Sequence, residues 1–185
     1  ITDNHVVATE DFAIKAAAIA SAGPTVGIVV RAPGAATGHQ MALLLRVRAL
    51  VRPPEAAFLA SGDPALGAAT QAPGLELPAG GPTAAEARGT YPAGRIGIVV
   101  QSFTEAETAV AGGADFLIAG PVFPSLADPG REGFGLDWLR HIAELGIPVV
   151  GCGGIGVDQI GSVRAAGAWG VAANLALWSA LDPAR

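Results

Sequence analysis

The sequence predicts an α/β fold, a compact (β/α)8 TIM barrel formed by a single domain over residues 1–185. The first observation is a repeated pattern, in which a helix tail of small residues meets a glycine and continues as an apolar strand. The second is that the expected strands are continuous apolar runs, which indicates parallel strands buried on both faces. The third is that strands and helices alternate along the whole chain, as successive βα units require.

Three copies of the repeated pattern mark the units. They read "AIASAGPTVGIVVRA" near the N-terminus, then "AVAGGADFLIAGPVF", and finally "SVRAAGAWGVAANLA". An open doubly wound sheet is the rival architecture. It would usually show a glycine-rich loop after the first strand, and none is visible there, so we favour the barrel.

The bounds of each strand and helix are predicted from caps and from changes in the pattern of apolar residues. Ser102 is a good N-cap for the helix that follows it, and Asp158 suits the positive first turn of another helix. The first strand is expected to be truncated at Ile1–Thr2, with further residues before Ile1 in the natural protein. The other strands are expected at Thr25–Val30, Ala56–Ala60, Gly74–Leu77, Arg95–Val100, Asp115–Ala119, Ile147–Gly151 and Gly170–Ala173. Helices are expected near Asp11–Ser21, Gly38–Val51, Pro64–Thr70, Thr83–Arg88, Thr104–Ala111, Leu136–Glu144, Val157–Ala166 and Leu175–Leu181.

Composition narrows the class of protein. The net charge is −5 and the 11 basic residues are scattered, which argues against a nucleic-acid or acidic-membrane partner. A single cysteine, Cys152, excludes an intramolecular disulfide and suits a reducing cytoplasm. No apolar run approaches the roughly 20 residues that span a bilayer. We therefore expect a cytoplasmic protein with a small-molecule ligand, and the oligomeric state stays open.

A glycine-rich segment, Gly151–Gly156, follows one of the late strands. Glycine lets backbone N–H groups approach an anion closely, and a helix expected from Val157 adds its positive end. Phosphate sites of barrels commonly form after the seventh and eighth strands. We therefore predict a phosphate bound by Gly153, Gly154, Ala173 and Asn174. The alternative is that the glycines only permit a tight turn.

Few other residues indicate chemistry. Arg31 ends the second expected strand, where it could bind a phosphate or carboxylate, or could simply be an exposed cation. His5, His39 and His141 show no metal-ligand spacing, and His141 is expected to face solvent. No metal site is predicted from the residues themselves.

Several motifs together resemble those of the thiamine phosphate synthase/TenI family. They are "GADFLIAGPVFPS", "PGREGFGLDW", "IPVVGCGGI" and "AGAWGVA", with "VVR" at Val29–Arg31 and "LELP" earlier in the chain. The resemblance implies a (β/α)8 barrel that binds a thiazole phosphate at the glycines after the last two strands. It also implies a substrate-binding role for Ser125, which ends the G-P-V-F-P-S motif.

The resemblance implies residues that bind Mg²⁺ and diphosphate, and this chain has other residues at most of those positions. The family's synthases join a pyrimidine diphosphate to a thiazole phosphate with loss of pyrophosphate, a step that needs Mg²⁺ and cationic groups. Of the family's Q-L-R-x-K motif this chain keeps only Arg31. The Asn-Asp pair falls on Ser61-Gly62, with Asp63 one position on, and the loop lysine falls on Asp128.

The TenI branch shifts a proton on a thiazole carboxylate phosphate. Its catalytic histidine falls on Pro121, and its fifth-strand histidine falls on Gln101. Proton transfer needs a titratable group within reach, which Pro121 cannot supply. Glu76 is a candidate replacement base, or else it points outward from its strand.

The main hypothesis is a thiamine-biosynthesis-related, TenI-like barrel that binds a phosphorylated thiazole or a similar small phosphate, with the family's catalytic groups largely replaced. No catalytic residue is assigned. One alternative is a thiamine phosphate synthase with a rearranged metal site that uses Asp63, Asp128 and Arg131, and Mg²⁺ is expected only in that case. Another is a non-catalytic regulatory or binding barrel. A different phosphate-handling enzyme, such as an isomerase, stays open because a fold does not fix a function.

Overall fold

The computed structural model describes residues 1–51, 56–125 and 130–180, in which strands and helices alternate. The strands are β1 (Gly27–Val30), β2 (Ala57–Ser61), β3 (Gly74–Leu77), β4 (Arg95–Val100), β5 (Phe116–Ala119), β6 (Val149–Cys152) and β7 (Gly170–Ala172). The helices are α1 (Asn4–Val7), α2 (Phe12–Ser21), α3 (Thr37–Leu50), α4 (Pro64–Ala69), α5 (Ala84–Arg88), α6 (Phe103–Ala111), α7 (Gly135–Ala143), α8 (Ile160–Ala165) and α9 (Leu175–Trp178). A 3-10 turn, η1 (Val157–Gln159), precedes α8.

Internal contacts divide the chain into two compact units. Unit 1 contains Ile1–Glu76, Ala87–Gly94 and the chain from Leu177 on, and unit 2 contains Leu77–Glu86 and Arg95–Ala176. Within each unit, parallel strands lie side by side in sequence order. The predicted α/β class with parallel strands is therefore confirmed.

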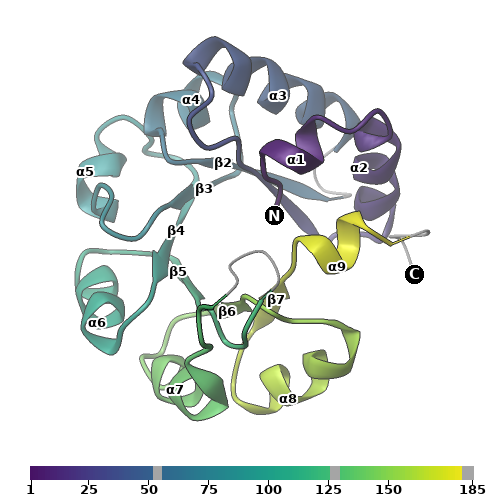
Figure 1. Ribbon diagram of the computed structural model, residues 1–185. Helices are drawn as coiled ribbons and strands as arrows, with labels where there is room; N and C mark the ends of the chain where they lie inside the picture. Colours follow the sequence, from purple (N-terminus) through teal and green to yellow (C-terminus); the bar gives the residue numbers. More distant parts are fainter. Residues whose placement is uncertain (52–55, 126–129, 181–185) are drawn as a thin grey trace. The chain divides into compact units, whose positions relative to one another are not determined.

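In unit 1, β1 pairs with β2 and β2 pairs with β3, so that Ser61 lies opposite Glu76 at the end of β2. Helices α2 and α3 pack against each other and against β1 (Figure 1). Burying one large apolar side chain contributes about 1.5–3 kcal/mol, and several such side chains hold these elements together. The fully or almost fully buried ones include Phe12, Ile28, Leu44 and Phe58.

In unit 2, the strands β4, β5, β6 and β7 pair in order, and Cys152 lies opposite Ala172 in the last pair. Helix α6 packs on β4 and β5, α7 on β6, and α8 on β7 (Figure 1). Because the strands are parallel, the residues that follow β6 and β7 emerge at the same edge of the sheet. That edge carries the predicted phosphate site.

The start of the chain differs from the prediction. The described residues form seven strands, and Ile1–Thr2 is not one of them, so the eight-stranded barrel is not seen in full. The segment does lie against β1, because the Thr2 N–H donates to the carbonyl oxygen of Val29 at 2.9 Å. Helix α1 follows at once and was not predicted. Asp3 starts it as an N-cap, with its carboxylate accepting from the Val6 N–H at 2.8 Å, and this acidic residue was the missed signal.

Two helix predictions also need correction. The helix expected over Val157–Ala166 begins as the 3-10 turn η1 and becomes α-helical only at Ile160. The last helix ends at Trp178 in the described part of the chain, and Leu181, its expected end, lies outside that part. By contrast, the Ser102 N-cap is confirmed, since its hydroxyl accepts from the Glu105 N–H at 3.2 Å.

Candidate functional site

The chain turns sharply after β6 through Gly153 and Gly154. Their φ angles of +85° and +64° lie in the left-handed region, which strains any residue with a side chain. A Cβ on Gly154 would lie 2.3 Å from the carbonyl oxygen of Pro124, and one on Gly153 would lie 2.6 Å from the Cα of Pro121. The turn therefore requires glycine at both positions. A substitution at either position would disturb the turn itself as well as the binding of any ligand.

The backbone N–H groups of Gly153 and Gly154 donate no hydrogen bond to any part of the chain that the structure describes. Because Cys152 lies opposite Ala172, the residues Ala173 and Asn174 leave β7 beside this turn. The structure thus brings together the four residues predicted to bind phosphate. Two N–H groups without acceptors at the carboxyl end of parallel strands suit an anion. Phosphate binding itself stays a prediction.

The segment after β5 packs along the same turn. The Val122 N–H donates to the carbonyl oxygen of Cys152 at 2.8 Å, and the Phe123 N–H donates to that of Gly153 at 3.1 Å. Ser125 is half-buried and lies two residues after Phe123, the residue that bonds to the glycine turn. Asp128, where the resemblance placed the loop lysine, lies outside the described residues.

The helix after the glycine turn contributes less than the sequence suggested. The Gly156 N–H, which comes just before η1, donates to the side-chain oxygen of Gln159 at 2.9 Å. An N–H group that is already bonded within the chain is not available to an anion. The case for a phosphate therefore depends on the glycine N–H groups rather than on the helix start.

Arg31 comes directly after β1 in unit 1, and Thr2 fixes its backbone. The Thr2 hydroxyl accepts from the Arg31 N–H at 2.8 Å and donates to the Arg31 carbonyl oxygen at 2.9 Å. The Arg31 side chain is 37% exposed, and its guanidinium makes no hydrogen bond within the described chain. A cation with available donors at the carboxyl end of a parallel strand suits an anionic ligand.

Glu76, on β3, is fully buried, and every other residue of that strand is buried too. Its Oε2 accepts a hydrogen bond from the Ser61 hydroxyl and lies 3.9 Å from the Arg31 Nε. Its Oε1 is buried and has no hydrogen-bond partner among the residues described. Ser61 was not predicted as a site residue. The sequence carried no signal for it, because its contact with Glu76 depends on the register between β2 and β3.

Asp63 lies just after β2 and is half-buried. One of its carboxylate oxygens accepts from the Ala65 N–H at 2.8 Å and so caps α4. Across residues 1–51, 56–125 and 130–180, no three His, Cys, Asp or Glu side chains gather as a metal-binding group. Within these residues the structure thus offers single carboxylates near strand ends rather than a complete metal site.

The three histidines lie on the surface. His5, His39 and His141 are all exposed, which confirms the prediction for His141. No helix in the described residues has the length and apolar character that crossing a membrane requires.

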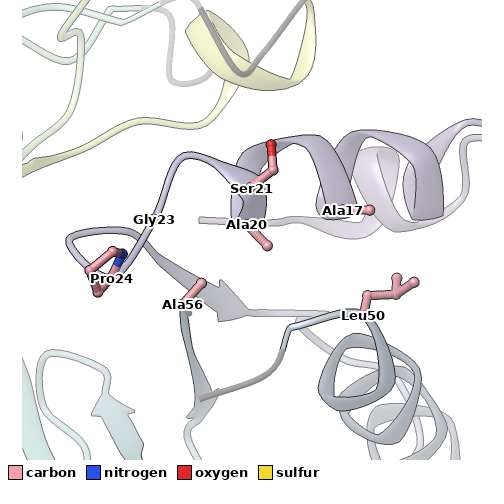
Figure 2. Close-up of a pocket in the computed structure, with 7 residues that line it drawn as sticks. All are labelled: Ala17, Ala20, Ser21, Gly23, Pro24, Leu50 and Ala56. Atoms are coloured by element: carbon pink, nitrogen blue, oxygen red, sulfur yellow. The ribbon is translucent and has the colours of Figure 1, made fainter. Parts of the chain in front are cut away.

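A pocket of about 360 Å³ lies in unit 1, at the amino ends of β1 and β2 (Figure 2). Among the described residues that line it, small and apolar side chains dominate and none is titratable; they are Ala17, Ala20, Ser21, Gly23, Pro24, Leu50 and Ala56.

Comparison with known proteins identifies the family of this chain. Residues 1–177 match the family described as thiamine monophosphate synthase. A thiamine-phosphate synthase of Pyrococcus abyssi is 32% identical over 170 residues, which are 91% of this chain and 82% of that protein. The solved thiamine phosphate pyrophosphorylase of Pyrococcus furiosus is 30% identical with a TM-score of 0.84, over 99% of this chain and 88% of that one.

Other relatives match over less of their length. A thiamine-phosphate synthase of Caldivirga maquilingensis is 37% identical over 89 residues, which are 48% of this chain and only 43% of that protein. The match with the family nevertheless extends over nearly all of the present sequence. The chain belongs to the thiamine monophosphate synthase family.

Proposed function

We propose that this protein is a thiamine phosphate synthase, which joins a pyrimidine diphosphate to a thiazole phosphate and releases pyrophosphate. One observation carries the proposal: the likeness to a thiamine phosphate pyrophosphorylase over 99% of the chain, with a TM-score of 0.84. The names of sequence relatives from Geobacillus thermodenitrificans and Pyrococcus abyssi support it. These comparisons favour the synthase over the main hypothesis, a TenI-like barrel with largely replaced catalytic groups.

The residues themselves also weigh against a TenI-type isomerase. Such a reaction moves a proton, and the two positions that the resemblance assigns to histidines hold Pro121 and Gln101. Neither side chain exchanges a proton near neutral pH. A bond-forming substitution needs no such group, because it depends on binding and on charge stabilisation.

In this proposal each charged part of the substrates has a partner in the chain. The N–H groups of Gly153 and Gly154 bind the thiazole phosphate, with Ser125 contributing a hydroxyl. Arg31 binds the diphosphate. The bond between the methylene carbon and the diphosphate oxygen breaks, and its electron pair leaves with the pyrophosphate. The thiazole nitrogen then uses its lone pair to form the new carbon–nitrogen bond. Arg31 accelerates the reaction because it pairs more strongly with the leaving group as negative charge accumulates.

Mg²⁺ fits the site in one way. It is usually held by one or two carboxylates together with substrate phosphates, and we assign this role to Asp63, which is half-buried just after β2. When bound, Mg²⁺ would neutralise part of the charge on the departing pyrophosphate. Asp63 would hold it while its other oxygen keeps capping α4.

The test is product formation. Purified protein with both substrates and Mg²⁺ should give thiamine phosphate, identified by mass, together with an equal amount of pyrophosphate. Omitting either substrate should remove both products. If both substrates bind but no product forms, the chain is a binding barrel and the proposal fails.

We also propose the finer architecture, in which residues 1–185 form one (β/α)8 barrel domain that acts in the cytoplasm. The bond from the Thr2 N–H to Val29 supports it, because that is how an eighth strand would pair with β1. The one cysteine in the sequence, Cys152, suits the reducing compartment.

A further inference from the structure

We infer that Glu76 is a specificity-determining residue, whose free carboxylate oxygen accepts an N–H of the ligand while Arg31 binds the anionic arm of that same ligand. The inference rests on the proposed function and adds a chemical requirement to it. The ligand must combine an anion with a neighbouring N–H donor, as an amino-substituted nitrogen heterocycle with a diphosphate arm does.

Glu76 is fully buried, and its Oε2 is occupied by the Ser61 hydroxyl. Its Oε1 is buried without a hydrogen-bond partner among the described residues. Leaving a buried acceptor unpaired is costly, more so for a carboxylate, so such an atom indicates a partner that arrives with a ligand. A carboxylate oxygen accepts hydrogen bonds, and therefore the missing partner is a donor.

The Arg31 Nε lies 3.9 Å from the Glu76 Oε2, which is an ion-pair distance but too long for a hydrogen bond. The Thr2 hydroxyl holds the Arg31 backbone at both its N–H and its carbonyl oxygen, while the side chain stays 37% exposed. The guanidinium is thus anchored at its base and can turn toward an anion. Such a turn would uncover the neighbouring carboxylate.

A buried negative charge beside Arg31 weakens the binding of a bare anion, because the two negative charges repel each other at short range. The same charge favours a ligand that brings an N–H donor, and favours it more if positive charge develops on the ring. The pair Arg31–Glu76 therefore selects a ligand of mixed character over pyrophosphate alone.

The experiment compares three probes by calorimetry at one fixed Mg²⁺ concentration. They are an aminopyrimidine methyl diphosphate, its analogue with a methyl group in place of the amino group, and inorganic pyrophosphate. The natural protein should prefer the amino compound over the methyl analogue by about tenfold or more, the range for a hydrogen bond to a charged group.

The variant Glu76→Met keeps the length of the side chain and removes the acceptor. It should bind the two pyrimidines equally, while its affinity for pyrophosphate stays the same or rises. Glu76→Gln removes the charge, and its preference should fall several-fold. This second variant keeps the test decisive if the methionine variant does not fold. Glu107→Met makes the same chemical change at an exposed glutamate of α6 and should keep the full preference.

The inference is overturned if the natural protein shows no preference for the amino compound. It is also overturned if the Glu76 variants lose all three probes equally, which would indicate a purely structural role. The proposed function fails separately. If the protein prefers the amino compound but forms no thiamine phosphate, the proposed synthase function is contradicted and this inference is not. If it forms thiamine phosphate without that preference, only this inference is contradicted.

Discussion

The Thr2 hydroxyl binds the backbone of Arg31 on both sides, accepting from its N–H at 2.8 Å and donating to its carbonyl oxygen at 2.9 Å. Thr2 is 1% exposed, so no water replaces these bonds easily. The N-terminal segment therefore fixes the residue to which we assign the anionic ligand.

Replacing Thr2 by valine keeps the shape and removes both bonds. We expect Thr2→Val to lower the free energy of unfolding by about 1–3 kcal/mol, because it leaves a donor and an acceptor unpaired. Urea unfolding measures this, with Thr2→Ser as the control that keeps the hydroxyl. A valine variant more stable than the serine variant would contradict the role of the bonds.

Arg31→Ala should weaken the binding of inorganic pyrophosphate by about 1.5–3 kcal/mol, the range for hydrogen bonds to charged groups. The matched control is Arg95→Ala, since Arg95 begins β4, is 79% exposed and pairs with Asp115 at 3.1 Å. That change should leave affinity almost unaltered. Calorimetry in which both variants lose affinity equally would remove Arg31 from the site.

A negative charge beside the glycine turn should abolish phosphate binding. Gly154 is unsuitable for this test, because a Cβ there would collide with Pro124. Ala173 is half-buried beyond β7, so Ala173→Asp adds the charge without breaking the turn. We expect a loss of at least about tenfold in affinity for inorganic phosphate.

The control for that variant is Ala176→Asp, the same change at an exposed position of α9. It should retain the affinity of the natural protein. An unchanged affinity for phosphate in Ala173→Asp would place the phosphate elsewhere.

The pKa of Asp11 is lowered, first by a hydrogen bond from Lys15 and then by one from Thr9. Lys15 Nζ lies 2.9 Å from the Asp11 carboxylate. Because the folded pKa is below the unfolded one, the pair stabilises the fold above the ordinary pKa of aspartate. That contribution is lost as the pH falls through the folded value. In Lys15→Gln the NMR-measured pKa of Asp11 should rise toward its ordinary value, whereas Lys15→Arg should keep it low.

The sequence predicted most of the fold, and the reason is visible in particular elements. The runs at β3 and β4 are bounded by glycine, proline or turn residues, and both strands have the predicted ends. The Ser102 cap likewise depends only on neighbours in the chain. Signals of this kind come from residues that are neighbours in the chain, so the sequence alone is enough to predict these elements.

What the sequence could not show depends on distant residues. The pairing of Ser61 with Glu76 depends on the register between β2 and β3, and the Thr2–Arg31 bonds join residues 29 positions apart. The collision that forces glycine at position 154 comes from the loop after β5. None of these contacts has a periodicity or a spacing that reveals it.

The most direct test of the account is the steady-state rate at which the protein releases pyrophosphate from the pyrimidine diphosphate in the presence of the thiazole phosphate. A synthase should turn over at least on the order of once per minute, be stimulated by Mg²⁺, and form one thiamine phosphate per pyrophosphate; ordinary enzymes reach about 1 s⁻¹ or more. Arg31→Ala should lower that rate. A natural protein that binds both substrates and releases no pyrophosphate above the uncatalysed rate would contradict the proposal.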